Sequence, residues 1–358
     1  MTTNPELPSY LAYCRAGFEA ELATELTALA KAKPHHLTAV AGSGFVHAVF
    51  NRGIKLADPS WQSAVFARQL IVADAKPVDL PMQDRVTPLM AAAQHLLTMR
   101  GMEKVSAIWV EYPDTNEGKA LSKLAQALQI RLTEGLQRAG RLQQGIQTRL
   151  HVLLTPERQA WLGTSDVRQA STWPLGIVRL RMPHDAPSRS TLKLAEAFHT
   201  FLGDQATRLL MPEMRAVDLG AAPGGWTWQL INRGLHVTAV DNGRLKGDLV
   251  DNALVRHLRE DGFRFKPKKA VDWMVCDMVE SPARIATLVG NWLSQGWARH
   301  SIFNLKLPMK KRYEEVERCR GILMEAMAGK RYRLQLKQLY HDREEVTGYC
   351  GLIPRSKS

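Results

Sequence analysis

The segment from Ala216 to Leu230 constrains the fold more than any other part of the chain. An apolar run ends at Leu219, a glycine-containing loop spans 220–225, and a helical pattern begins at Trp226. This order of strand, tight turn and helix start is typical of the place where an α/β sheet holds a nucleotide-like ligand. Glycines let the backbone approach such a ligand closely, and Pro223 stiffens the turn.

The spacing of the glycines argues against a dinucleotide. The fingerprint G-x-G-x-x-G needs a second glycine two residues after Gly220, and Ala222 stands there. The loop therefore favours a smaller adenosine cofactor and disfavours an NAD-dependent oxidoreductase.

Strands and helices alternate regularly after residue 190. We predict strands at 215–219, 236–241, 271–277 and 301–307, helices at 191–202, from 226, and at 252–260, 282–292 and 313–327, and two closing strands at 333–340 and 346–353. This order predicts a doubly wound α/β domain with a terminal antiparallel hairpin at 190–358.

In residues 1–170 the predicted strands and helices do not alternate regularly. Short strands at 9–14, 44–50 and 105–112, helices at 18–30 and 119–137, and a hairpin made of 150–154 and 159–164 suggest one or two small α+β units. The Pro-containing, basic stretch in 171–189 is the predicted linker.

The composition favours a polyanionic partner. The net charge is +13 and the sequence pI is about 9.7, which is typical of RNA- or DNA-binding proteins, although a basic solvated surface alone would give the same balance. The four cysteines form no CxxC or Cys/His pattern, so we expect a reduced protein without a metal. Residues 1–8 do not resemble a signal peptide, and no run of about 18 apolar residues exists, so we expect no membrane association and a cytoplasmic location.

Three aspartates follow the predicted elements of the second domain. Asp218 could brace the loop or reach the ligand. Asp241 ends the second strand about twenty residues beyond the glycines, where a carboxylate binds ribose hydroxyls, although a turn residue is the alternative. Asp261, at the end of the helix predicted at 252–260, could bind an adenine amino group or simply belong to the turn.

With these residues in view, the sequence resembles the FtsJ-like ribose 2′-O-methyltransferases. The resemblance covers about 186–353 and rests on the D-L-G-x-x-P-G-G-W loop, on 188–194, and on three later motifs at 276–278, 304–307 and 343–346. It implies S-adenosyl-L-methionine as cofactor, bound by Ser190, Gly220, Ala221, Ala222, Pro223, Gly224, Gly225, Trp226, Asp241, Asp261 and Asp277. The whole chain resembles family members that carry an N-terminal THUMP RNA-binding domain and methylate a cytidine ribose in 23S rRNA. We expect a monomer.

The resemblance also implies a Lys-Asp-Lys-Glu tetrad, which maps onto Lys193, Asp277, Lys306 and Glu345. A ribose hydroxyl needs a base to remove its proton, and Lys306, which interrupts an apolar run, is the predicted base. We expect burial and the second cation, Lys193, to lower its pKa toward neutral. Glu344 competes with Glu345 for the last position, and the resemblance favours Glu345, because the family's Glu directly precedes the first apolar residue of the strand, here Val346.

Two other functions remain open at this point. A base-directed RNA methyltransferase is disfavoured because no Asn/Asp-Pro-Pro-aromatic motif follows the fourth strand and no cysteine follows a proline. An RNA-binding assembly factor on a methyltransferase fold is disfavoured by the complete tetrad. Basic segments at 266–269, 310–312 and 330–333 are candidates for phosphate contacts, with a solvated charged surface as the alternative.

Overall fold

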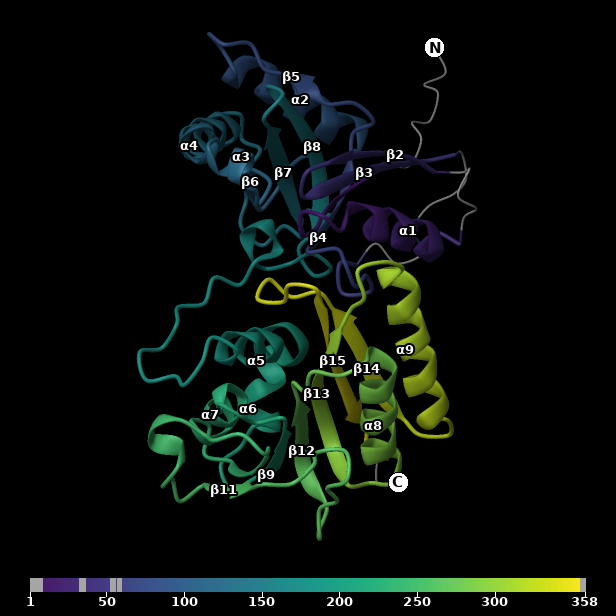
Figure 1. Cartoon of the computed structure of the whole chain (residues 1–358). Helices are drawn as coiled ribbons and strands as arrows, with labels where there is room; N and C mark the ends of the chain where they lie inside the picture. Colours follow the sequence, from purple (N-terminus) through teal and green to yellow (C-terminus); the bar gives the residue numbers. More distant parts are fainter. Residues whose placement is uncertain (1–8, 32–36, 52–55, 57–59, 355–358) are drawn as a thin grey trace. The chain divides into compact units, whose positions relative to one another are not determined.

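The computed structural model describes residues 9–31, 37–51, 56 and 60–354. The chain divides into two compact units, Met1–Ile177 and Val178–Ser358 (Figure 1). The residues 1–8, in which we expect no signal peptide, lie outside the described part.

The first unit is built on one mixed sheet with the strand order β2-β3-β1-β4-β8-β7-β6, and β5 pairs with β8. Its elements are β1 (Ser9–Tyr13), α1 (Glu19–Leu29), β2 (Leu37–Gly42), β3 (Phe45–Phe50), β4 (Gln69–Ala73), β5 (Val78–Asp79), α2 (Val86–Met99), β6 (Ala107–Glu111), α3 (Asn116–Lys119), α4 (Ser122–Arg138), β7 (Thr148–Thr155), β8 (Gln159–Asp166) and the turn η2 (Pro174–Gly176). The hairpin predicted at 150–164 is confirmed as β7 and β8, which pair antiparallel.

One apolar cluster joins the helices of this unit to its sheet. Leu128, Leu132 and Leu136 recur at the spacing of one helical face of α4 and are buried against Leu150 and Val152 of β7. The predicted α+β character of the region is therefore present, and all of its described strands belong to one sheet.

The second unit is the predicted doubly wound domain. Its seven-stranded sheet has the order β11-β10-β9-β12-β13-β15-β14, in which the first five strands are parallel and β15 runs antiparallel between β13 and β14. The strands are β9 (Arg215–Leu219), β10 (His236–Val240), β11 (Val255–Leu258), β12 (Val271–Cys276), β13 (Ala298–Lys306), β14 (Tyr332–Lys337) and β15 (Glu345–Leu352). The terminal hairpin is thus confirmed.

Helices cover both faces of this sheet. The elements α5 (Thr191–Ala197), α6 (Ala206–Leu209) and α7 (Gly225–Ile231) lie on one face, and α8 (Pro282–Ser294) and α9 (Arg312–Ala326) lie on the other (Figure 1). Short turns η3 (Phe198–Leu202), η4 (Gly203–Gln205) and η5 (Gly247–Leu249) complete the unit. Trp273 and Trp292 are fully buried, as their apolar surroundings in the sequence predict.

One predicted element is wrong. The segment 252–260 is not a helix, because Val255–Leu258 forms the edge strand β11, parallel to β10 with Val237 opposite Val255. Its apolar residues have helical spacing, but pairing with the free edge of β10 satisfies the backbone of both segments, and this tertiary interaction decides the structure. Asp261 therefore follows the end of a strand, at the edge where such sheets bind ligands.

The order of the strands reverses at β9. The chain adds β10 and β11 on one side of β9 and β12 and β13 on the other. In parallel α/β sheets, ligands bind beyond the carboxyl ends of the strands at this switch point. The carboxyl ends of β9 and β12 are therefore the place to look for a site.

Candidate active site

The loop after β9 makes contacts that only glycine permits at two positions. Gly220 has a φ of +79°, and a Cβ there would lie 2.6 Å from Cγ of Met278. A Cβ at Gly225 would collide with the hydroxyl of Ser190. The loop thus packs directly against the segment after β12 and against the start of α5.

Hydrogen bonds fasten this loop to α5. Thr191 Oγ1 donates to the Gly225 carbonyl at 2.9 Å, and Trp226 Nε1 donates to the Ser190 carbonyl at 3.1 Å. Since α5 also carries Lys193, the loop and that lysine are held in one arrangement.

A cavity of about 360 Å³ opens beside the loop. Five of the predicted cofactor residues line it: Gly220, Ala222, Asp241, Asp261 and Asp277. Its acidic lining suits a cofactor that carries a positive sulfonium and hydroxyls able to donate to carboxylates, so the residues present fit S-adenosylmethionine. A larger cavity of about 690 Å³ is lined by the first residues of β9 and β10, by β11 and by 265–269, and it includes none of the predicted cofactor residues.

The other predicted cofactor residues do not line this cavity. Trp226 is buried in the apolar core, and Ser190 Oγ lies 2.7 Å from Ser188 Oγ. These two residues, together with Ala221, Pro223, Gly224 and Gly225, lie in or directly against the loop that forms the cavity wall. The peptide bond between Ala222 and Pro223 is cis.

Asp241 shapes the loop through both of its carboxylate oxygens. Oδ2 accepts a hydrogen bond from the Ala222 amide at 3.0 Å, and Oδ1 accepts one from the Gly243 amide at 2.6 Å. Each oxygen keeps a further lone pair, so the carboxylate can still accept from a ligand in the cavity.

Asp218 braces the base of the loop and is fully buried. Its Oδ2 accepts from Thr227 Oγ1 at 2.7 Å, which joins the end of β9 to α7. Burial raises the pKa of Asp218 to about 7, the Thr227 hydrogen bond opposes this shift, and the charge of Asp277 adds to it. Of the two roles considered for Asp218, the structure shows the bracing one.

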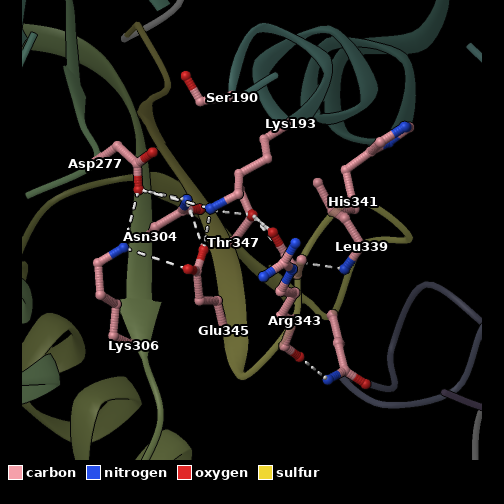
Figure 2. Close-up of polar contacts among 12 residues, drawn as sticks. Ser190, Lys193, Asp277, Asn304, Lys306, Leu339, His341, Arg343, Glu345 and Thr347 are labelled. Atoms are coloured by element: carbon pink, nitrogen blue, oxygen red, sulfur yellow. Dashed lines mark hydrogen bonds and ion pairs between the residues drawn. The ribbon is translucent and has the colours of Figure 1, made fainter. Parts of the chain in front are cut away.

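The four residues of the predicted tetrad meet at one point, although they come from four elements (Figure 2). Asp277 follows β12, Lys306 ends β13, Glu345 begins β15 and Lys193 lies on α5. Lys306 Nζ is 3.4 Å from Asp277 Oδ1 and 3.3 Å from Glu345 Oε1. Lys193 Nζ is 3.9 Å from Asp277 Oδ1 and forms an ion pair with Glu345 Oε2.

The electrostatics of Lys306 correct one expectation. Burial lowers its pKa, but attraction to Asp277 and Glu345 and the hydrogen bonds to both outweigh burial, so the pKa is raised above its ordinary value. The expected shift toward neutral is therefore wrong, because the two carboxylates lie closer to Lys306 than the sequence could show. On Glu345, burial raises the pKa, but the ion pairs and hydrogen bonds with Lys193 and Lys306 outweigh burial and lower it.

The geometry separates Glu344 from Glu345. Glu344 Oε2 forms an ion pair at 2.7 Å with Nη2 of Arg312, the first residue of α9, and Glu344 is not part of the tetrad. Glu345 contacts both lysines.

Sequence reasoning missed Asn304, which lies between the two carboxylates. Its side chain is fully buried, and Nδ2 donates to Asp277 Oδ1 at 2.9 Å and to Glu345 Oε2 at 3.2 Å. The available signal was its place two residues before Lys306, since residues i and i+2 of a strand share one face.

Sequence reasoning also missed Glu196, one helical turn beyond Lys193. Its carboxylate accepts from the Tyr340 amide at 2.8 Å and the His341 amide at 3.0 Å. It thereby fixes the turn that leads into Glu345.

Comparisons with known proteins identify the family. Residues 186–307 match the FtsJ-like methyltransferase model, residues 84–166 the model of the N-terminal part of ribosomal RNA large subunit methyltransferase M, and residues 7–71 the RlmM ferredoxin-like domain. The ribosomal RNA large subunit methyltransferase M of Methylococcus capsulatus is 48% identical over 96% of this chain and 98% of its own length. The chain belongs to this methyltransferase family. The relative of the same name from Laribacter hongkongensis is 48% identical over 96% of both chains.

Membership of the family confirms S-adenosylmethionine as the methyl donor, because the FtsJ-like domain is an S-adenosylmethionine-dependent methyltransferase domain. Within the described residues, no group of three or more His, Cys, Asp or Glu is arranged to hold a metal ion. No helix in the described ranges is long and apolar enough to cross a membrane.

Proposed function

We propose that this chain transfers a methyl group from S-adenosylmethionine to the 2′-hydroxyl of a ribose, that of a cytidine, in 23S rRNA. The names of its relatives and its FtsJ-like domain support the reaction class. The observation that carries the choice of acceptor is the convergence of two lysines and two carboxylates beside the acidic cavity. Such a cluster suits proton removal from a hydroxyl and offers no nucleophile for attack on a base.

When bound, S-adenosylmethionine would supply an electrophilic methyl group, and its sulfur would keep the electron pair of the S–C bond that breaks as the bond to the ribose oxygen forms. Lys306 Nζ takes the 2′-hydroxyl proton, and Asp277 and Glu345 hold that nitrogen in place. With Lys306 neutral, Lys193 and the two carboxylates leave one net negative charge in the cluster, so Lys306 accepts a proton strongly. The raised pKa makes this neutral form scarce, by about tenfold for each unit that the pKa lies above the pH.

Binding of the donor follows from the lining of the cavity. Asp241 would accept from the ribose hydroxyls, Asp261 would accept from the adenine amino group, and Asp277 would contact the methionine portion. Gly220 and Ala222 allow close approach of the backbone. The remaining predicted residues of the loop and of the start of α5 shape the wall.

We assign RNA binding to a THUMP-type region at 1–170, joined by a linker at 171–189 to the catalytic domain at 190–358, in a cytoplasmic monomer. Within the catalytic domain, the exposed Lys310 and Lys311 follow Lys306 closely and would guide phosphates by sequence-independent contacts. Arg312 is paired with Glu344, so its role is to hold the start of α9. The basic segments 266–269 and 330–333 remain candidates for further phosphate contacts.

The proposal is tested with labelled donor and an RNA fragment that contains the target. We expect turnover with the ribonucleotide, none when that nucleotide is replaced by its 2′-deoxy form, and a 2′-O-methylcytidine on mapping. Lys306→Ala should abolish methyl transfer while donor binding stays within about twofold. Arg318→Ala, an exposed side chain on α9, is the matched control. Continued methylation of the 2′-deoxy substrate would show that a base is the acceptor, and no transfer by the native enzyme to any rRNA would favour the assembly factor.

A further inference from the structure

A line of buried polar side chains leads from the turn before β15 to the tetrad (Figure 2). Asp342, Thr347 and Asn304 are each fully buried. Thr347 Oγ1 lies 3.0 Å from both carboxylate oxygens of Asp342 and 2.7 Å from Asn304 Oδ1. Asn304 then donates to Asp277 and Glu345.

The hydrogens available on each side chain determine which one donates and which one accepts in each of these contacts. The Asn304 amide faces two carboxylates that ion pairs with lysines keep charged, so its NH₂ group points to them and its oxygen points to Thr347. The reversed amide would bring its oxygen within about 3 Å of two anionic oxygens, which is repulsive. Thr347 therefore gives its single hydroxyl hydrogen to Asn304 Oδ1.

Thr347 then has no hydrogen left for Asp342. An ionised Asp342 would place two oxygens against the lone pairs of Thr347 Oγ1, with no hydrogen in either contact. Since Oδ2 of Asp342 accepts from the Leu339 amide at 2.9 Å, a proton on Oδ1 supplies the hydrogen for the contact between Oδ1 and Thr347 Oγ1.

The surroundings of Asp342 favour the same state. Among the described residues, the charged side chains that act on its pKa are Glu345 from β15 and Glu196 and Lys193 from α5. Burial raises the pKa of Asp342 well above its ordinary value. The hydrogen bond from the Leu339 amide opposes this shift, the two glutamates add to it, and Lys193 lowers the pKa.

We propose that Asp342 is a neutral carboxylic acid that donates a hydrogen bond to Thr347, which donates in turn to Asn304. This series of hydrogen bonds positions both carboxylates of the tetrad. Asp342, Thr347 and Asn304 are positioning residues for the reaction proposed above, on which this inference rests. These hydrogen bonds hold the Asn304 amide in one orientation, and that amide holds Asp277 and Glu345 at the distance that lets both contact Lys306. Without the Thr347 hydroxyl, the amide is free to turn and the carboxylates lose their common donor.

Substitution of Asp342 by asparagine separates the two protonation states. An asparagine can donate through Nδ2 to Thr347 and accept through Oδ1 from the Leu339 amide, as the neutral acid does. Asp342→Asn should therefore keep kcat within about twofold of the native value. Thr347→Val, similar in shape but without the hydroxyl, should lower kcat by about tenfold or more while KM for the donor changes by less than about threefold, and Thr347→Ser should restore most of the rate.

A second measurement needs no activity. A carboxyl that stays protonated in the folded protein but ionises in the unfolded chain weakens the fold as pH rises above about 4, until its folded pKa is reached. Asp342→Asn removes that loss, so its melting temperature relative to the native protein should rise as pH increases from 5 toward the folded pKa of Asp342. Asp251→Asn, at an exposed position, is the control and should show no such trend.

The outcomes are distinct. If Asp342→Asn lowers kcat as much as Thr347→Val, or if its relative melting temperature does not rise with pH, Asp342 is ionised in the fold and the inference is wrong. If Thr347→Val keeps the native kcat, the hydrogen bonds from Asp342 through Thr347 to Asn304 do not position the tetrad. A base-directed product would contradict the proposed function alone, because the melting comparison would still report the state of Asp342.

Discussion

Replacing Asp218 with asparagine should change how the stability of the second unit depends on pH. Asp218 is fully buried at the end of β9, and its pKa is raised from 3.8 to about 7. The folded protein therefore keeps a proton on this group between pH 4 and pH 7, whereas the unfolded chain releases it. By linkage, the group's contribution to stability is complete below pH 4 and is lost as pH rises toward 7.

The size of the effect follows from the shift. A difference of about 3 pKa units corresponds to about 4 kcal/mol, since one unit is about 1.4 kcal/mol. Asp218 is fully buried, so solvent does not screen this value. In Asp218→Asn the loss is absent, and the free energy of unfolding of the variant relative to the native protein should increase by about 4 kcal/mol from pH 4 to pH 7 and then stay constant. The new amide also places an NH₂ group where Oδ1 has no hydrogen-bond partner, which costs about 1–3 kcal/mol at every pH and leaves the slope unchanged.

Amide hydrogen exchange in β9 and β10 measures this difference, because it reports on the second unit without requiring both units to unfold together. Exchange rates are corrected for their intrinsic dependence on pH, and Asp251→Asn, at an exposed position, is the matched control. A difference between variant and native protein that stays flat from pH 4 to pH 7 would show that Asp218 is ionised in the fold, and the reasoning from burial would be wrong.

Three further predictions concern the site. If Lys306 is the base, kcat should rise about tenfold per pH unit between pH 6 and pH 9, since its pKa is raised and only the neutral form takes a proton, and a flat profile under conditions where chemistry limits the rate would contradict that role. Glu345→Gln should lower kcat about 100-fold, while Glu344→Gln should change it less than about threefold, so equal effects would refute the separation of the two glutamates. Gly220→Ala should weaken donor binding by about tenfold or more in calorimetry, because its Cβ would meet a side chain at 2.6 Å, whereas Gly247→Ala, with a φ of +63° and open space around it, controls for backbone strain alone.

The sequence was sufficient for the architecture where local and tertiary preferences agree. The strands at 215–219, 236–240 and 271–276 alternate with glycine turns and amphipathic helices, so their positions were predicted within one or two residues. The segment 252–260 was mispredicted because its apolar spacing fits a helix as well as an edge strand. Only the open edge of β10 decides between them.

The members of the site were easier to predict than its energetics. Lys193, Asp277, Lys306 and Glu345 stand in motifs, but no motif gives the distances among them. The direction of the pKa shift on Lys306 depends on two carboxylates at 3.3 and 3.4 Å. Asn304 and Asp342 were missed for a related reason: a polar residue in an apolar strand or turn reveals its role only when its partners are known.

Charge balance explains why a neutral acid suits this position better than an ionised one. Two ammonium groups and two carboxylates make the tetrad neutral overall, and a third carboxylate behind it would raise the pKa of Lys306 further. Each additional unit would reduce the neutral, proton-accepting form of Lys306 about tenfold at a given pH. Asp342, held protonated, supplies the hydrogen that orders Thr347 and Asn304 without adding that charge. The cluster thus gains a fixed geometry from a buried carboxyl, while the pKa of the base stays set by its burial and by the attraction of Asp277 and Glu345.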